Sequence, residues 1–238
     1  MRSTSNRIKR FYKSVSVDQD NAGYFVSLDN RVIKTAGKST LRLPTPGLAE
    51  AIADEWRSQD DYIDWRLMGL NTLANQAVDY IGPNRQAVID ETAGFGGSDL
   101  LCYRAEAPLA LRERQSQIWD PIIAWAQNHY GVCLAVTAGI LHIAQPAATV
   151  ARLTAGFEQS DNFTLAAFHA AVGLCGSLIL GLALFEGELL PEQAWQAAQL
   201  DEDWQSERWG RDAEAVERRN NGLAALLTAH RMKGLMGR

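Results

Sequence analysis

The side chains best suited to recognise another protein lie in LDEDWQSERWG, residues 200–210. We expect one unbroken helix over residues 191–209. At 100° per residue, that helix places Trp195, Glu202 and Trp209 on one stripe at heptad spacing. A carboxylate between two indoles is typical of an interface anchor, because Trp is enriched among the residues that dominate binding. The alternative is a helix that packs its tryptophans inward and leaves its acids in water, and spacing alone does not separate the two.

The neighbouring face of this helix carries Asp201, Gln205 and Arg208 among alanines. Arg208 is the only basic residue near Glu202 in the sequence, and it lies roughly 120° away around the helix. A local ion pair is therefore poor, so the Glu202 carboxylate contributes little to folding. The candidate partner-binding residues of this helix are therefore Trp195, Asp201, Glu202, Gln205 and Trp209.

A second cluster begins with DLLCYR, which runs from Asp99 to Arg104. The polar and aromatic residues that follow it are Arg112, Arg114, Gln115, Trp119 and Asp120. Charged groups interleaved with large apolar ones usually form ion pairs that lock two helices together, because a buried charge must be paired. A contact surface is the other interpretation, so Asp99 and Arg104 remain candidate partner-binding residues.

Sequence motifs for catalysis are absent. The chain has no GxSxG, Walker A, GxGxxG or HExxH motif, and no CxxC or other metal-ligand spacing. The four histidines are far apart, and His169 is better explained as a hydrogen-bonded core residue than as a ligand or base. We therefore expect no catalytic residue, no metal and no cofactor. The rival hypothesis is a helical enzyme acting on a small molecule in an interdomain cleft through Asp99, Arg104 and His169.

Length and composition describe an ordinary globular chain. Its 238 residues suffice for one large or two small domains, and 47% hydrophobic with 21% charged residues argues against disorder. A net charge of -5 argues against nucleic-acid binding, which needs a basic face. The three cysteines lie far apart among apolar neighbours and are expected to be reduced core thiols in a reducing compartment. With no secretory signal, we expect a monomer in the bacterial cytoplasm, or in the mitochondrial matrix of a eukaryote.

An uncharged run, LAAFHAAVGLCGSLILGLALF, occupies residues 165–185. As one helix it would extend roughly 30 Å, enough to cross a bilayer core. Acidic residues flank it and no Lys or Arg anchors its ends, so we expect a buried central helix without stable membrane insertion. Gly173, Ser177 and Gly181 recur at every fourth position and predict a small-residue groove along that helix.

The N-terminal third has a different pattern. Residues 11–43 alternate short runs of strand formers with Asn, Asp and Gly turns, which is typical of antiparallel hairpins. Thr45-Pro46 then predicts a helix start, and Gly82-Pro83 ends a second helix. Beyond a flexible hinge at residues 94–97, helical patterns continue to the end. The expected fold is α+β, with a small antiparallel β-rich N-terminal domain (1–82) followed by a larger all-helical C-terminal domain (83–238).

Several short motifs in this order resemble one family, the assembly chaperones for the α subunit of the F-type ATP synthase catalytic head in mitochondria and α-proteobacteria. The resemblance covers nearly the whole chain. The matching pieces are Arg10-Phe11-Tyr12-Lys13, Gly23-Tyr24, Leu28-Asp29, residues 48–56 with Gln59, Leu73-Ala74-Asn75 with Asp79, residues 99–104, Gln115 with Trp119-Asp120-Pro121 and Trp125, and residues 202–210.

The resemblance implies two domains and a function without catalysis. It implies that the protein binds the free α subunit and prevents its aggregation until the β subunit replaces it. It also implies that an acidic residue in the Glu202 region is needed for function. A free ring subunit exposes an apolar interface that aggregates, so its chaperone must cover that interface reversibly.

Overall fold

The computed structural model describes residues 8–139, 141–210 and 212–237. The chain forms two compact units. The first unit contains the chain up to Asn84, together with Asn162–Ala166 and the residues from Arg231 on. The second contains Arg85–Asp161 and Ala167–His230. A small N-terminal sheet followed by a mostly helical region confirms the predicted α+β class. The first unit therefore includes two segments that lie beyond the predicted division at residue 82, namely Asn162–Ala166 and the residues from Arg231 on.

The sheet of the first unit is an antiparallel meander of three strands, β1 (Val15–Asp20), β2 (Gly23–Leu28) and β3 (Arg31–Val32). Val17 pairs with Val26, and the register places Asp20 opposite Gly23 across the first turn. In the second turn, Asp29 and Asn30 both have positive φ, 46° and 65°. Such values suit a two-residue hairpin turn, and Asp and Asn tolerate them best among residues with a side chain. The predicted hairpins are confirmed.

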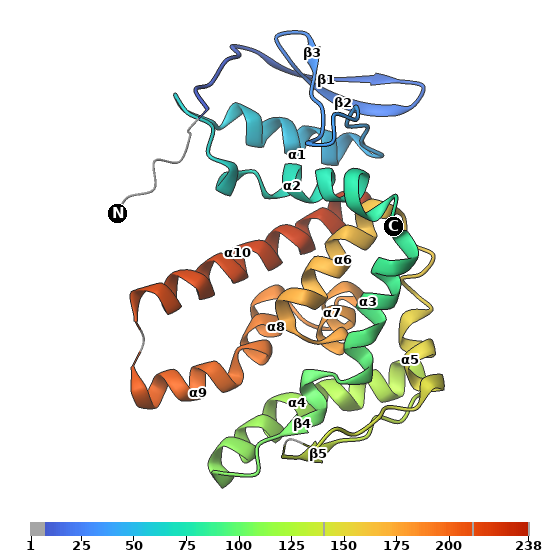
Figure 1. Ribbon diagram of the computed structural model, residues 1–238, viewed down its shortest axis with the longest axis vertical. Helices are drawn as coiled ribbons and strands as arrows, with labels where there is room; N and C mark the ends of the chain where they lie inside the picture. The colour runs from blue at the N-terminus through green and yellow to red at the C-terminus, as the bar shows by residue number, and fades with distance from the viewer. Residues whose placement is uncertain (1–7, 140, 211, 238) are drawn as a thin grey trace. The chain divides into compact units, whose positions relative to one another are not determined.

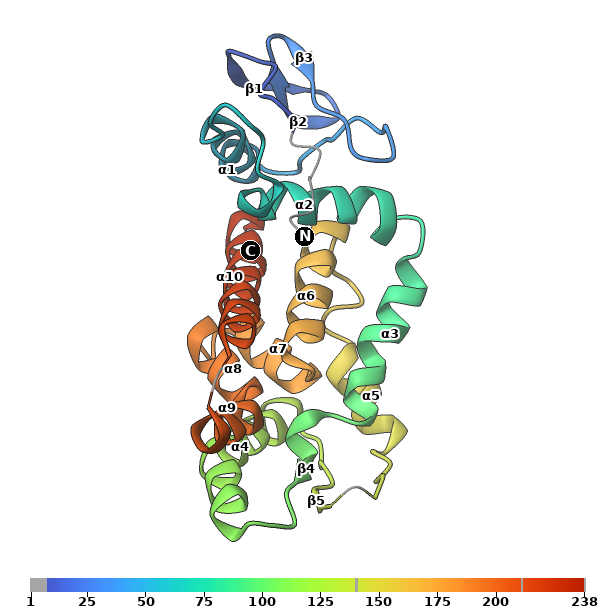
Figure 2. The same cartoon turned by 60° about the vertical axis from the view of Figure 1, so that its left-hand side comes forward.

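Helix α1 (Pro46–Arg57) covers one face of this sheet (Figure 2). The Thr45 hydroxyl accepts a hydrogen bond from the Leu48 amide (3.1 Å) and donates one to the Leu235 carbonyl (2.8 Å). The first bond starts the helix as predicted. The second bond joins Leu235, near the C-terminal end of the described chain, to the start of α1 within the first unit.

Helix α2 (Gly69–Gln76) and the π-helical turn Ala77–Ile81 follow an irregular connection. The Glu55 carboxylate accepts hydrogen bonds from the amides of Leu70 and Asn71, at 2.7 and 2.8 Å. These amides belong to the open N-terminal turn of α2, so Glu55 replaces the missing N-cap side chain. Burial raises the pKa of Glu55, although the two amides oppose that shift. The Trp56 indole donates to the Asn71 side chain at 3.3 Å, which binds α1 to α2.

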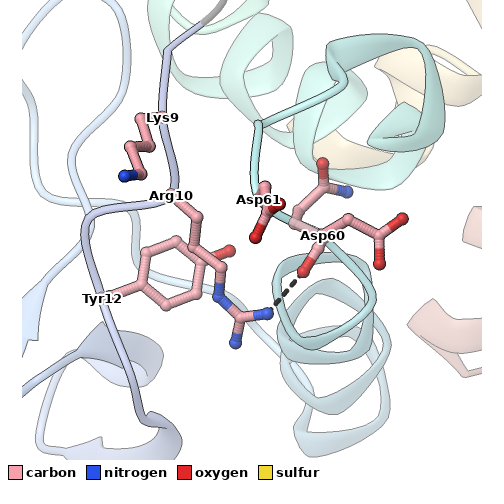
Figure 3. Close-up of a pocket in the computed structure, with 6 residues that line it drawn as sticks. Lys9, Arg10, Tyr12, Asp60 and Asp61 are labelled. Carbon is pink, nitrogen blue, oxygen red and sulfur yellow. Dashed lines mark hydrogen bonds between the residues drawn. The ribbon is translucent and has the colours of Figure 1, made fainter.

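The N-terminal segment is held against the end of α1. The Tyr12 hydroxyl donates to the Trp56 carbonyl at 2.6 Å, and the Arg10 guanidinium donates to the Gln59 carbonyl (Figure 3). The two rings of Tyr12 and Trp56 meet edge to face at 5.6 Å, and Trp56 meets Trp65 in the same way at 5.9 Å. Trp56 is therefore the centre of an aromatic row in the first unit.

Most of the remaining chain is helical (Figure 1). The helices are α3 (Arg85–Gly97), α4 (Leu109–Tyr130), α5 (Ala147–Thr154), α6 (Asn162–Cys175), α7 (Leu178–Glu186), α8 (Pro191–Ala198), α9 (Leu200–Trp209) and α10 (Ala213–Met236). A short parallel pair, β4 (Tyr103–Arg104) with β5 (Thr137–Ala138), adds to the predicted helices. The predicted hinge at residues 94–97 is wrong, because α3 continues through it. A Cβ at Gly96 would lie 2.7 Å from Leu178 Cδ2, so close packing holds this glycine in the helix.

The single helix predicted over residues 165–185 is also wrong, since α6 and α7 separate at Gly176 and Ser177. Gly176 has φ 63°, and the Ser177 hydroxyl caps α7 by accepting from the Leu180 amide at 3.0 Å. The predicted small-residue groove does not form. A Cβ at Gly173 would meet nothing within 4 Å, whereas one at Gly181 would lie 2.5 Å from Val172 Cγ2. Within the part of the chain that the structure describes, none of the helices has the length and hydropathy needed to cross a membrane.

Candidate functional site

Four of the predicted partner-binding residues line one surface hollow of about 510 Å³, which we call the α9 hollow. Figure 1 shows the helices that build it, with α9 following α8 and leading into α10 as a helical hairpin. The residues that line the hollow are Trp195, Gln199, Glu202, Gln205, Ser206, Trp209, Gly210, Ala215, Arg218 and Arg219. The predicted stripe of Trp195, Glu202 and Trp209 therefore faces one space.

The helix that carries these residues is not continuous. It breaks at Gln199 (φ -95°, ψ 10°), so the unbroken helix predicted over residues 191–209 is wrong. The buried Trp119 indole donates to the Ala197 carbonyl at 2.9 Å, which fixes the last turn of α8. The Gln199 carbonyl accepts from the Asp203 amide at 2.8 Å and so begins α9. The break leaves the three stripe residues around a common hollow.

Glu202 is exposed, and no hydrogen bond or ion pair holds its carboxylate among the described residues. The other charges of the hollow are paired. Arg219 binds Asp203 at 2.8 Å, and Arg218 binds Glu214 at 2.8 Å. The hollow therefore offers one carboxylate without an internal partner.

The two tryptophans of the hollow differ in role. Trp209 is 87% exposed, so nearly its whole indole is open to contact. Trp195 is only 6% exposed and packs against α10 at Gly222, where an added Cβ would meet its ring atoms. The Trp195 Nε1 is buried without a hydrogen-bond partner in the described part of the chain. Trp195 forms the floor of the hollow, and Trp209 forms its exposed edge.

Asp201 lies on another side of α9. Its carboxylate accepts a hydrogen bond from the Gln115 side chain at 2.8 Å, and it is only partly exposed. Gln115 in turn accepts from the Ala105 amide at 2.8 Å. Asp201 therefore joins α9 to α4, whereas Gln205 is exposed and lines the hollow.

Arg104 and Asp99 are both buried, so neither side chain presents a surface to a partner. Arg104 is 5% exposed, donates to Asp120 at 2.6 Å and lies 4.9 Å from the Trp119 ring centre. Asp99 is fully buried and accepts from the Ser177 hydroxyl at 2.7 Å. Burial raises the pKa of Asp99 to about 6, against the effect of its hydrogen bonds. These contacts agree with the interpretation of this cluster as structural.

Each residue of the enzyme hypothesis is bonded to a different structural partner. His169 Nδ1 lies 3.0 Å from the Thr92 hydroxyl, whereas Asp99 is bonded to Ser177 and Arg104 to Asp120. Among the described residues, no group of three His, Cys, Asp or Glu side chains is placed to hold a metal ion.

The α10 wall of the hollow was not anticipated. Arg218, Arg219 and Gly222 face α8 and α9, yet no motif marks them in the sequence. A usable signal is the short connection between two predicted helices, which makes them neighbours. When two helices are joined by a short connection, residues equally far from it along the chain can meet. Asp203 and Arg219, which form the ion pair between α9 and α10, lie equally far from position 211.

Comparison with known proteins identifies the family. The chain matches the family model described as ATP12 chaperone protein over residues 9–127. The mitochondrial protein atp12 of Schizosaccharomyces pombe is 26% identical over 227 residues, which are 90% of this chain and 78% of that protein. The crystal structure of Atp12 from Paracoccus denitrificans is 40% identical with a TM-score of 0.90, covering 96% of this chain and 98% of that one. A crystal structure from Agrobacterium tumefaciens is 40% identical with a TM-score of 0.92, covering 96% of this chain and 86% of that one. The chain belongs to the ATP12 chaperone family.

Proposed function

We propose that this protein is an assembly chaperone of the F-type ATP synthase that binds the free α subunit of the catalytic head. It prevents aggregation of that subunit until the β subunit takes its place. Membership of the ATP12 chaperone family supports a chaperone function. The resemblance of the sequence motifs to assembly chaperones of the α subunit implies that subunit as the client.

The observation that carries the proposal is the exposed Glu202 carboxylate beside the exposed Trp209 indole in the α9 hollow. A carboxylate without an internal partner can pair with a Lys or Arg of the client at little desolvation cost near a rim. An indole supplies a large apolar contact from few rotatable bonds. Together they fit a modest interface that another subunit can displace.

In this proposal the protein works as a monomer by binding and release, with no catalytic residue, metal or cofactor. It acts where the ATP synthase head is assembled, in the bacterial cytoplasm or the mitochondrial matrix. The proposed contact residues are Trp195, Glu202, Gln205 and Trp209, and Asp201 supports them through α4.

Aggregation of the isolated α subunit tests this proposal directly. Light scattering of the diluted α subunit should be suppressed by an equimolar amount of this protein, and the two should co-elute in gel filtration. Addition of the β subunit should then release the chaperone. Aggregation at an undiminished rate, with separate elution of the two proteins, would exclude the α subunit as the client.

A further inference from the structure

The first unit contains a second hollow, of about 510 Å³, which we call the sheet hollow. Leu28 from β2, Ile33 just after β3, and Trp56 from α1 contribute apolar surface to its floor. Each of these residues is less than 9% exposed, so the floor is part of the packed core. The hollow belongs to the first unit alone and shares no residue with the α9 hollow.

Phe11 lines the sheet hollow and is 67% exposed. Among the described residues its ring touches one other ring, that of Tyr12, edge to face with the centres 5.4 Å apart. Leaving a phenyl group in water forfeits roughly 1.5–3 kcal/mol of the free energy that burial would supply. An apolar floor next to an exposed phenyl ring suits an apolar side chain from another molecule.

The rim of the sheet hollow is basic. Arg31 and Lys34 line it, both are exposed, and neither has an ion pair among the described residues. The one acid in the lining, Asp29, is occupied by the amides of Lys13 and Ser14 and by the Ser14 hydroxyl, at 2.8–3.1 Å. These hydrogen bonds hold the pKa of Asp29 below its usual range.

The surrounding segment has the same sign of charge. Residues 8–43 contain seven Lys or Arg, three Asp and no Glu, although the whole chain has a net charge of -5. An acidic ligand is therefore attracted to this part of the surface.

Hydrogen bonds within the chain hold the part of the hollow that Tyr12 lines. The Tyr12 hydroxyl is bonded to the Trp56 carbonyl, and Arg10 is bonded to Gln59 in the adjoining polar hollow of Figure 3, which shares Tyr12. Binding to such a surface costs little ordering of the chain.

From these observations we propose that the sheet hollow is a second docking site, for an extended protein segment that carries a large apolar side chain flanked by acidic residues. The apolar side chain packs on the floor against Phe11, and the acids pair with Arg31 and Lys34. The assignment of this segment to the chaperone's client rests on the proposed function, whereas the chemistry of the site does not.

Fluorescence anisotropy of labelled peptides with the full-length protein tests the site. The probes are EELFEE, its charge-reversed analogue KKLFKK and the apolar-deleted EESSEE. We expect saturable binding of EELFEE, at least about tenfold tighter than of either analogue. The double substitution Arg31→Glu/Lys34→Glu and the single substitution Phe11→Ser should each weaken EELFEE by about tenfold or more, with unchanged circular dichroism.

A matched control is Arg112→Glu/Arg152→Glu, which changes the net charge equally at exposed residues outside both the hollow and the basic segment 8–43, and which should bind EELFEE like the wild type. Equal binding of KKLFKK, no saturable binding of EELFEE, or insensitivity to Arg31→Glu/Lys34→Glu would each overturn the proposal. Self-association that this double substitution abolishes would assign the hollow to a second copy of the chain instead. Capture of the α subunit is scored separately, so a failure of the proposed function is distinguishable from a failure of this site.

Discussion

Gly222 is the point at which α10 approaches the floor of the α9 hollow, and a single added methyl group tests that packing. In Gly222→Ala the new Cβ would meet Trp195 Cη2 and would lie 2.6 Å from Cζ2. Contacts this short do not persist, so either the buried indole or the helix must shift. Gly234→Ala in the same helix is the matched control, because a Cβ there would meet nothing within 4 Å.

The two substitutions should change stability in opposite directions. Overpacking of a well-packed site costs about 1–3 kcal/mol. Replacing glycine by alanine inside a helix returns up to about 1 kcal/mol. We therefore expect Gly222→Ala to lower the free energy of unfolding by about 1–2 kcal/mol and Gly234→Ala to raise it slightly. At roughly 2–4 °C per kcal/mol for a chain of this size, the two melting temperatures should differ by several degrees.

Differential scanning calorimetry measures both variants, and a second substitution identifies the cause. Trp195→Phe removes the ring atoms that the new Cβ meets, and it also removes the Nε1 group that is buried without a partner. In the Gly222→Ala background, Trp195→Phe should therefore cost less than it does in the wild type. Equal melting temperatures for Gly222→Ala and Gly234→Ala would refute the packing of α10 against Trp195.

Three further predictions concern the packing of side chains inside each unit. Gly181→Ala should destabilise by about 1–2 kcal/mol, since its Cβ would lie 2.5 Å from Val172, whereas Gly173→Ala should stabilise slightly; chemical denaturation that ranks them the other way would contradict this. Burial raises the pKa of Asp99 to about 6, so its protonated form favours the folded state, and this contribution is complete below about pH 4 and lost as the pH rises through 6. The stability of wild type relative to Asp99→Asn should therefore fall by about 2 kcal/mol between pH 4 and pH 7, and a difference that is constant or rises with pH would contradict this. Trp56→Ala should cost about 3–5 kcal/mol because it empties a core position and breaks the hydrogen bond to Asn71; an unchanged melting temperature would remove Trp56 from the core.

Local signals in the sequence predict the elements whose causes are local. Thr45 and Pro46 start α1 through their own side chains, and Asp29-Asn30 makes the second hairpin turn through its backbone preference. The apolar period from Leu109 to Tyr130 also predicts helix α4, but the break expected at Asp120-Pro121 is wrong, because the helix continues through Pro121. These features depend on residues within a few positions of one another.

The breaks in the helices could not be read in this way. Ser177 starts α7 in contact with Asp99, which lies 78 residues earlier in the chain. The break at Gln199 is accompanied by a bond from Trp119 to Ala197, also 78 residues away. The apolar pattern continues through both positions in the sequence and predicts unbroken helices there. Gly176 and the Ser177 cap are local signals for the first break, and a tertiary contact accompanies each of the two breaks.

The candidate site was predicted in part for the same reason. Heptad spacing predicted that Trp195, Glu202 and Trp209 share one face, and all three line one hollow despite the break in the helix. Spacing does not report burial, so it could not distinguish Asp99 and Arg104, which lie in the interior, from the exposed residues. The Arg219–Asp203 ion pair joins α10 to α9 and could be identified only from the structure, whereas Arg218 pairs with Glu214 of its own helix, four residues away.

The central claim is that the Glu202 carboxylate binds the α subunit, and the affinity of Glu202→Lys for that subunit tests it most directly. Glu192→Lys is the matched control, since both glutamates are exposed in the first turn of a helix and only Glu202 lines the hollow. We expect Glu202→Lys to weaken the complex by about tenfold or more at low salt, with a smaller loss at high salt and a melting temperature matching that of Glu192→Lys. Glu202→Gln should lie between Glu202→Lys and the wild type. Binding and protection of the α subunit by Glu202→Lys at wild-type strength would contradict the account.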